Sequence, residues 1–360
     1  MHAQGRLESL DILRGLTVIG MIIVNAAAGL QRYPVPSPLL HSHWIGLTLA
    51  DVVFPAFIFI VGVSVALSMP AARGLDARAG RRIAGRALRL IVIGIVLTNI
   101  YWLADYDANR FRWLGVLQRI GLVFAVVAPL QLLLSTRQIV WTAITALLVY
   151  SLLCVLALPD GTPANLYVPG ANLAGWLDRQ VLGTHIYVQG PLGYDPEGLL
   201  STIPAMAQAL LGVVAGRALA SSSSAVRQLV VAGAVMIVVG LSVSIVIPVS
   251  KDLWSMSFVL LTSGIAALLL GALHEWVDRR GRRPIGTKIC IAFGVNAIAA
   301  YVLHYVAAGV LNWSSFDALY LAGSRFLGAQ GALILPIGLF LGLIAWVMLA
   351  LLKRGWVVKI

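Results

Sequence analysis

Long apolar segments recur along the whole chain and are separated by shorter polar segments. A helix that crosses the hydrocarbon core of a bilayer needs about 20 predominantly apolar residues, and ten segments of the sequence reach roughly that length. The pattern therefore predicts an all-α, polytopic integral membrane protein, a helical bundle with about ten transmembrane helices. The predicted spans are residues 14–31, 47–69, 86–104, 113–134, 139–158, 198–219, 228–249, 254–274, 288–310 and 331–352.

Composition agrees with this class. Of the 360 residues, 60% are hydrophobic and only 11% are charged, whereas soluble domains carry about 25% charged residues. Cys154 and Cys290 both lie in apolar segments, so they predict neither a disulfide framework nor a metal site. We expect one transmembrane domain over residues 1–360, with its longest polar segment, residues 159–198, as an outer loop.

Basic residues are distributed unevenly among the loops. The formal net charge of +12 would suggest nucleic acid as a partner of a soluble chain, but in a membrane chain the positive-inside rule accounts for it. With the N-terminus inside, nineteen of the 26 Lys and Arg residues fall on the inner side. Both termini are therefore predicted to be cytoplasmic. The inner basic segments 70–89 and 278–284 are expected to contact anionic lipids or to attract an anionic cofactor.

The segment from His41 to Asp51 joins a polar outer loop to a long apolar run. Trp44 suits the membrane interface, where its N–H stays hydrated. Asp51 is unusual, because a carboxylate in the bilayer core costs about 3 kcal/mol and usually faces a cavity or a partner. Two interpretations remain open. Asp51 caps or pins helices, or His41 and Asp51 form one wall of a reaction chamber at the outer end of this helix.

The first span carries polar residues at both ends. Asp11 and Arg14 are three residues apart and can pair across one helical turn. Asn25 follows Arg14 by eleven residues, which is almost three whole turns, so the two share a face about 16 Å apart. A guanidinium near the inner surface and an amide near the outer surface then point the same way. The alternative is an ordinary helix start followed by an interhelical amide hydrogen bond.

Four further polar positions lie within or beside the apolar segments. Arg119 lies within a span and should have a partner, because a lone cation is costly there. Glu197 belongs to an acidic helix entrance, which suits a cationic or polyhydroxylated substrate or caps the helix N-terminus. Lys251 belongs to an interfacial cluster, and Asn296 places an amide inside a span. His43, His185, His274 and His304 have ordinary structural explanations as interfacial or core side chains.

These residues together resemble a known family, the transmembrane heparan-α-glucosaminide N-acetyltransferases and their bacterial relatives. The motifs extend over residues 6–305, and one departure is Ile45, where the family usually has asparagine. The resemblance rests on Ser9-Leu10-Asp11 with Arg14-Gly15, Val24-Asn25, His41 with Trp44, Gly46-Leu47-Thr48, Ala50-Asp51 and Phe54-Pro55, Gly115 to Ile120, Asp195 to Pro204, Lys251 with Leu253-Trp254, Ser257 to Thr262, and Asn296 to Ile298.

The resemblance implies acetyl transfer from cytosolic acetyl-CoA, across the membrane, to the amine of a terminal glucosamine. It also implies that His41 and Asn25 are the catalytic residues. Supporting or substrate-binding roles are expected for Asp51, Trp44, Glu197, Lys251 and Asn296, and binding of the CoA phosphates for Arg14, with Arg6 and Arg119 as weaker candidates.

The chemistry suits these residue types. An amine that attacks a thioester must lose a proton, and an imidazole titrates near neutral pH and is able to take it. An amide N–H stabilises the oxyanion of the tetrahedral intermediate, a contact that contributes about 3 kcal/mol in other enzymes. Asp51 is expected to orient an imidazole or the acceptor.

Two other functions use the same residues. One is an amino-sugar transporter or flippase, although no convincing inverted repeat is present, which counts mildly against a transporter. The other is an O-acyltransferase of cell-envelope glycans. For the acetyltransferase we expect an amino-sugar or glycan acceptor, contact with membrane lipids and a location in the bacterial inner membrane. A homodimer is compatible with the sequence.

Overall fold

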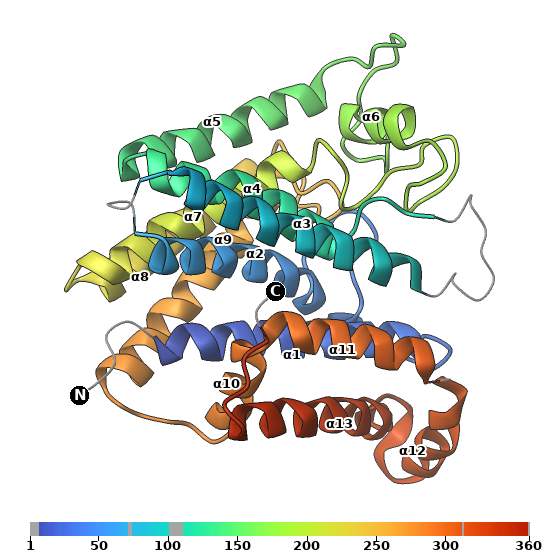
Figure 1. The fold of residues 1–360 in the computed structure, drawn as a ribbon. Coiled ribbons are helices and arrows are strands. Elements are labelled where there is room, and N and C mark those ends of the chain that lie inside the picture. Colours follow the sequence, from blue (N-terminus) through green and yellow to red (C-terminus); the bar gives the residue numbers. More distant parts are fainter. Residues whose placement is uncertain (1–6, 71–73, 101–110, 312, 359–360) are drawn as a thin grey trace. The chain divides into compact units, whose positions relative to one another are not determined.

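The computed structural model describes residues 7–70, 74–100, 111–311 and 313–358 (Figure 1). Within these residues the fold is all-α, as predicted, apart from one isolated β-bridge between Val188 and Tyr194. The helices are α1 Glu8–Gly29, η1 Ser37–Leu39, α2 Leu49–Ser68, α3 Ala77–Asn99, α4 Val116–Leu133, α5 Thr136–Val155, α6 Leu173–Leu182, α7 Thr202–Ser221, α8 Ala225–Val243, α9 Met256–Leu273, η5 His274–Arg279, α10 Thr287–Val295, α11 Ala297–Val310, η6 Trp313–Phe316, α12 Asp317–Gly331 and α13 Ile334–Lys353.

Eight of the described helices are long and apolar enough to cross a membrane, namely α1, α2, α4, α5, α7, α8, α9 continued by η5, and α13. The pair α10 and α11, bent by 87° at Asn296, counts as a ninth if it forms one broken span. The chain is thus a polytopic helical membrane protein. The tenth expected span, residues 86–104, falls partly on α3, and residues 101–104 lie outside the described part, so that span stays a prediction.

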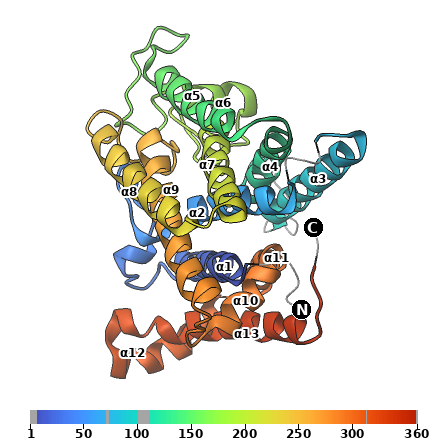
Figure 2. The ribbon, with the colours of Figure 1, turned by 90° about the vertical axis from the view of Figure 1, so that its left-hand side faces the viewer.

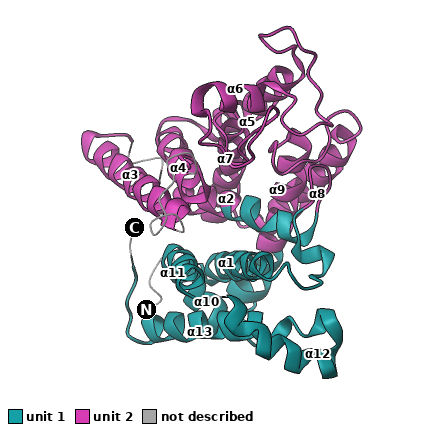
Figure 3. Ribbon diagram, turned by 90° about the vertical axis from the view of Figure 1, so that its right-hand side faces the viewer, with its two compact units in different colours: residues 1–41, 48–57, 272–360 teal, residues 42–47, 58–271 magenta. Residues whose placement is uncertain are grey.

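The chain forms two compact units, shown in Figure 3. Unit 1 comprises residues 1–41, 48–57 and 272–360, and unit 2 comprises residues 42–47 and 58–271. Each is described here by itself. The single domain expected over residues 1–360 stays a prediction, because compactness does not say whether either unit folds alone.

In unit 1 the backbones of α1 and α10 touch. A Cβ added to Gly294 would lie 1.8 Å from the carbonyl oxygen of Asp11, and one added to Gly15 would lie 1.9 Å from that of Cys290. Only glycine permits this approach at both positions, as is usual where membrane helices cross closely. Figure 2 shows α1 beside α10 and α11. The crossing brings Asp11 and Arg14 against the C-terminal end of α10.

The first turns of α2 also belong to unit 1 and pack on α1. A Cβ on Gly20 would lie 3.2 Å from the side chain of Val53, which marks the contact. Asn25 lies about 7.5 Å further along α1, and Asp51 lies about 3 Å before Val53 on α2. Both displacements point toward the loop that joins the two helices. Asn25 and Asp51 therefore lie on the same side of this contact, and Arg14 lies on the other side.

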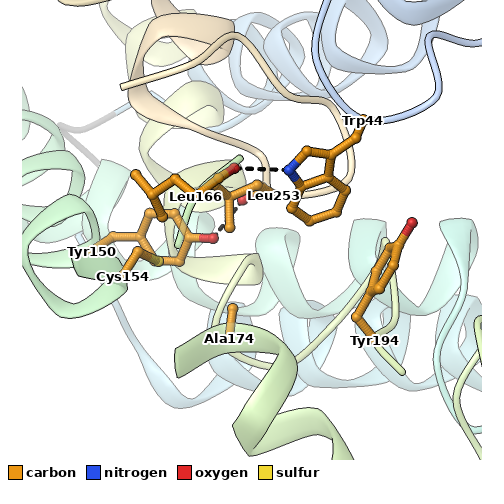
Figure 4. Packing of buried hydrophobic residues seen from close by; sticks show 7 residues of the cluster. All are labelled: Trp44, Tyr150, Cys154, Leu166, Ala174, Tyr194 and Leu253. Carbon is orange, nitrogen blue, oxygen red and sulfur yellow. Dashed lines mark hydrogen bonds between the residues drawn. The ribbon is translucent and has the colours of Figure 1, made fainter. Parts of the chain in front are cut away.

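Unit 2 is built around α7. The Cβ position of Gly212 on α7 is 2.0 Å from the carbonyl oxygen of Phe59 on α2, and that of Gly62 is 1.8 Å from the carbonyl oxygen of Ala209. The segment between α5 and α7 contains the short helix α6. Its apolar side chains close a buried cluster of Trp44, Tyr150, Cys154, Leu166, Ala174, Tyr194 and Leu253 (Figure 4).

Candidate active site

His41 and Asp51 form the central pair in unit 1. Nδ1 of His41 is 2.8 Å from Oδ1 of Asp51, whose side chain is fully buried, while 42% of the histidine side chain is exposed. A carboxylate only accepts hydrogen bonds, so Nδ1 of His41 carries the proton and donates it to Asp51. The neutral imidazole then presents the lone pair of Nε2, the ring nitrogen that does not contact Asp51. The pair thus fixes the tautomer that a general base requires.

Asp51 also caps its own helix. Its Oδ2 accepts the backbone N–H of Thr48 at 3.0 Å, and the Thr48 hydroxyl lies 3.0 Å from the same oxygen. Thr48 directly precedes α2, so this is one half of a capping box, in which a side chain in the first turn accepts the backbone N–H of the N-cap residue. The Thr48 hydroxyl also lies 2.8 Å from the carbonyl oxygen of Leu40. Asp51 therefore both caps its helix and contacts an imidazole, and the reaction chamber stays a prediction.

Asn25 is paired with a histidine that the sequence did not single out. Its Nδ2 lies 2.9 Å from Nε2 of His304 on α11. His304 is 1% exposed and packs edge-on against the rings of Tyr301 and Tyr305, with centroid distances of 4.9 and 4.7 Å. A single histidine in an apolar helix is usually a core residue, so no sequence signal marked it. The contact holds the Asn25 amide in one orientation.

Arg14 lies at the α1–α10 crossing. Its Nη1 donates to Oδ1 of Asp11 and to the carbonyl oxygen of Gly294, both at 3.1 Å. A cation at the last carbonyls of α10 interacts favourably with the helix dipole. The predicted pairing with Asp11 is thus present, and 21% of the Arg14 side chain is exposed. Binding of CoA phosphates by Arg14 stays a prediction, and the weaker candidate Arg6 lies outside the described residues.

Asn296 occupies the bend between α10 and α11. Its Nδ2 donates to the carbonyl oxygen of Trp356 at 3.1 Å, and its Oδ1 accepts the backbone N–H of Val358 at 2.8 Å. The amide therefore fastens the C-terminal segment to the bend. Its expected role toward the substrate stays a prediction.

Four of the expected site residues belong to unit 2, and Trp44 is the first. It is 6% exposed, its Nε1 donates to the carbonyl oxygen of Leu166 at 2.8 Å, and its ring lies edge-on to Tyr194 at 5.0 Å (Figure 4). An indole with its N–H bonded inside a buried cluster is well suited to packing.

Glu197 belongs to a buried charge cluster that includes Arg112, a residue the sequence did not identify. Nε of Arg112 donates to Asp195 at 2.8 Å and its Nη2 to Glu197 at 2.5 Å. Burial by itself would raise the pKa of Glu197, but the charges of Arg112, Arg119 and Lys251 lower it below its ordinary value. Glu197 is therefore a carboxylate at neutral pH. The sequence motif from Asp195 to Pro204 contains both acids, but it does not indicate that Arg112 lies between them.

Arg119 and Lys251 complete the unit 2 residues. Arg119 is fully buried, donates through Nη2 to Ser201 at 2.5 Å, and lies over the Trp254 ring at 4.8 Å. The partner expected for a cation inside a span is thus a hydroxyl together with an aromatic face. Lys251 is half-buried in a turn closed by the bond from Trp254 N to its carbonyl at 2.9 Å. Trp254 has a φ of 51°, which is strained for a bulky residue.

Sequence comparisons show which proteins this chain is similar to. The family described as heparan-alpha-glucosaminide N-acetyltransferase, catalytic, matches residues 6–239. The heparan-alpha-glucosaminide N-acetyltransferase of Homo sapiens is 35% identical over 84% of this chain and 53% of its own length. That of Mus musculus is 32% identical over the same shares. The chain spans about half the length of these curated relatives.

Proposed function

The chain belongs to the heparan-alpha-glucosaminide N-acetyltransferase family, and on that basis we propose that it transfers an acetyl group from acetyl-CoA to the amine of a terminal glucosamine-type sugar. The observation that carries the proposal is the pair of His41 and Asp51, with Nδ1 held by a buried carboxylate at 2.8 Å. This arrangement leaves Nε2 as the atom that takes a proton from the acceptor.

The reaction then proceeds in one transfer step. The amine nitrogen attacks the thioester carbonyl carbon, a C–N bond forms, and Nε2 of His41 takes the amine proton. The carbonyl oxygen becomes an oxyanion, which the Asn25 amide stabilises by donating an N–H. The C–S bond breaks, the sulfur leaves as CoA thiolate, and the imidazolium returns the proton to it. The products are the N-acetylated sugar and CoA, and Asp51 stabilises the imidazolium between the two proton transfers.

The phosphates of CoA bind at the other end of α1, at Arg14. Arg14 and Asn25 share a helix face about 16 Å apart, and they lie on opposite sides of the Gly20–Val53 contact. A guanidinium binds phosphate oxygens through paired N–H groups. The cosubstrate thus enters from the side of Arg14 and presents its acetyl group near Asn25 and His41.

The inner side is the cytoplasm, and the protein lies in a bacterial inner membrane with both termini inside. The support is the concentration of basic residues in alternate loops. Cysteines introduced at Ser37 and Ser221 are expected to react with impermeant thiol reagents from opposite sides of the membrane. Labelling of both positions from one side would contradict this topology.

Acetyl transfer by the purified protein tests the function. We expect transfer of radioactive acetyl from acetyl-CoA to glucosamine, and a loss of turnover of about 10²-fold or more in His41→Ala, the usual scale of acid–base catalysis. His43→Ala, two residues away, is the matched control and should stay near wild type. Transport of an unmodified amino sugar into vesicles without acetylation would instead favour a transporter, and near wild-type turnover in His41→Ala would overturn the assignment of the base.

A further inference from the structure

Helix α3 in unit 2 carries an arginine face that the proposed function does not use. One side of α3 is buried against α4 and consists of Ile83, Ala87, Leu90, Gly94 and Leu97. These residues follow one another at three- and four-residue spacing, which is a single helical stripe. The other side of the first turns carries the exposed arginines Arg78, Arg81, Arg82, Arg86 and Arg89. We call these five residues the arginine face.

The arginine face lacks carboxylate partners among the described residues. The acid nearest in sequence, Asp76, caps the helix and accepts the backbone N–H of Ala79 at 2.6 Å. Arg89 donates to the carbonyl oxygen of Gly85 at 3.2 Å, and Arg86 lies over the Phe124 ring at 4.8 Å. Within the described part of the chain, no ion pair neutralises these charges. Five guanidinium groups on one helix face therefore form a site of concentrated positive charge.

The same side of α3 becomes apolar immediately afterwards. Leu88, Val92 and Val96 are 61%, 49% and 53% exposed. Exposed leucine and valine at successive turns are what a helix presents to acyl chains in a membrane protein. A ligand bound at the arginine face would thus contact phosphate-binding groups. About one turn further along the helix it would contact an apolar surface. A free phosphate compound has no group that matches the second feature.

We propose that the arginine face of α3 binds the headgroups of anionic phospholipids. Guanidinium groups suit phosphodiester oxygens because they donate paired N–H bonds in a fixed plane. The acyl chains lie along the exposed Leu88, Val92 and Val96. Clusters of basic residues beside a membrane segment generally attract anionic lipid in this way. The arginine face includes none of the residues assigned to acetyl transfer, so the proposal does not depend on the proposed function.

Lipid retention by the whole protein tests this proposal. The protein is extracted from vesicles of phosphatidylglycerol and phosphatidylcholine, and the lipids that remain bound are counted by native mass spectrometry. We expect wild type to retain phosphatidylglycerol in preference to phosphatidylcholine. The variant with Arg78→Gln, Arg81→Gln and Arg82→Gln should retain at least about tenfold less phosphatidylglycerol than wild type. The matched control removes equal charge from three arginines that already pair with Glu275 or Glu8, through Arg279→Gln, Arg280→Gln and Arg283→Gln. This control should lose clearly less phosphatidylglycerol than the α3 variant.

Three outcomes would overturn the proposal. If wild type and the α3 variant retained equal amounts of phosphatidylglycerol, the arginine face would not be a lipid-binding site. Equal loss in the control would show that net charge alone holds the lipid. Displacement of phosphatidylglycerol by inorganic phosphate or by CoA would mean that the face binds a soluble anion. Arg→Lys changes at the same three α3 positions keep the charge and should restore most of the retention, which excludes misfolding as the cause.

Discussion

The His41–Asp51 pair of unit 1 and the Arg112 cluster of unit 2 use the same kind of acid for different ends. In both, a buried aspartate accepts a hydrogen bond from a nitrogen cation or potential cation. The histidine is 42% exposed, and an imidazole is a group that both takes and releases a proton in acid–base catalysis. The arginine is 16% exposed and stays charged at every working pH. The first pair is suited to move a proton, and the second is suited to hold its surroundings in place.

The difference teaches that a buried carboxylate is a poor guide to function until its partner is known. Asp51, Asp195 and Glu197 all stand in motifs of the family that the chain resembles. Burial and a partner that donates from nitrogen are common to all three. Only the partner of Asp51 is a partly exposed imidazole, a side chain that acid–base catalysis uses. The comparison predicts that loss of the Arg112 ion pairs reduces stability, whereas loss of the His41–Asp51 contact reduces turnover.

The largest expected effect is on stability, from Arg112→Met. Removal of one member of a buried ion pair usually costs about 3–5 kcal/mol, because the remaining charges stay buried and unpaired. We expect a large fall in melting temperature in detergent at pH 7. The exposed pair of Arg32 and Asp317 provides the control, since Arg32→Met should change the melting temperature little.

The pH dependence of this variant sharpens the test. In wild type the pKa of Glu197 is lowered from its ordinary value of 4.5. Its ionised form therefore stabilises the fold above that pH, and the contribution is lost as the pH falls through the folded-state pKa. In Arg112→Met, Glu197 loses the cation that lowers its pKa most, so the pKa of this buried acid rises. Acidification from pH 7 toward 5 should therefore stabilise the variant but not wild type, and parallel profiles would contradict the structural role of Arg112.

Next in size is the effect of Asp51→Asn on turnover. An amide at this position can present an N–H to the imidazole, which favours the wrong tautomer of His41. We expect kcat for acetyl transfer to fall by about 10²-fold or more, while the dissociation constant of CoA measured by calorimetry stays unchanged. Asp317→Asn is the matched control in the same unit. Equal losses in both variants would mean that Asp51 has no special relation to the base.

The sequence predicted the helices far better than the partners. Apolar length alone located α1, α2, α4, α5 and α7 to α9, because each must match the bilayer. The pairing of Asp11 with Arg14 followed from helical spacing, since both lie on one turn. The pairing of Asn25 with His304 joins residues 279 positions apart, and that of Glu197 with Arg112 joins residues 85 apart. Helix periodicity carries no information about which helices become neighbours.

A smaller effect is expected at Arg14, on affinity for the cosubstrate. Replacement by glutamine removes the charge that we assign to the CoA phosphates. Charge-assisted hydrogen bonds contribute about 1.5–3 kcal/mol, so CoA binding should weaken by about tenfold or more. Arg14 also contacts Gly294 at the end of α10, so melting curves must accompany the calorimetry. Arg32→Gln, three residues beyond the C-terminal end of α1, should leave CoA affinity unchanged. If the folded Arg14→Gln variant bound CoA with unchanged affinity, the role of Arg14 would be purely structural.

The smallest effect separates the two roles of Asp51. The hydroxyl of Thr48 lies 2.8 Å from the Leu40 carbonyl oxygen and 3.0 Å from Oδ2 of Asp51, so it joins the residue before His41 to the partner of its imidazole. Thr48→Val removes the hydroxyl but keeps the shape and the backbone N–H that caps the helix. A neutral hydrogen bond contributes about 1 kcal/mol, so kcat should fall about fivefold with CoA affinity unchanged. Thr48→Ser restores the hydroxyl and should recover most of the turnover. If kcat instead fell as far in Thr48→Val as in Asp51→Asn, the Thr48 hydroxyl rather than the carboxylate would position His41. If kcat were unchanged, Asp51 and the backbone alone would position His41.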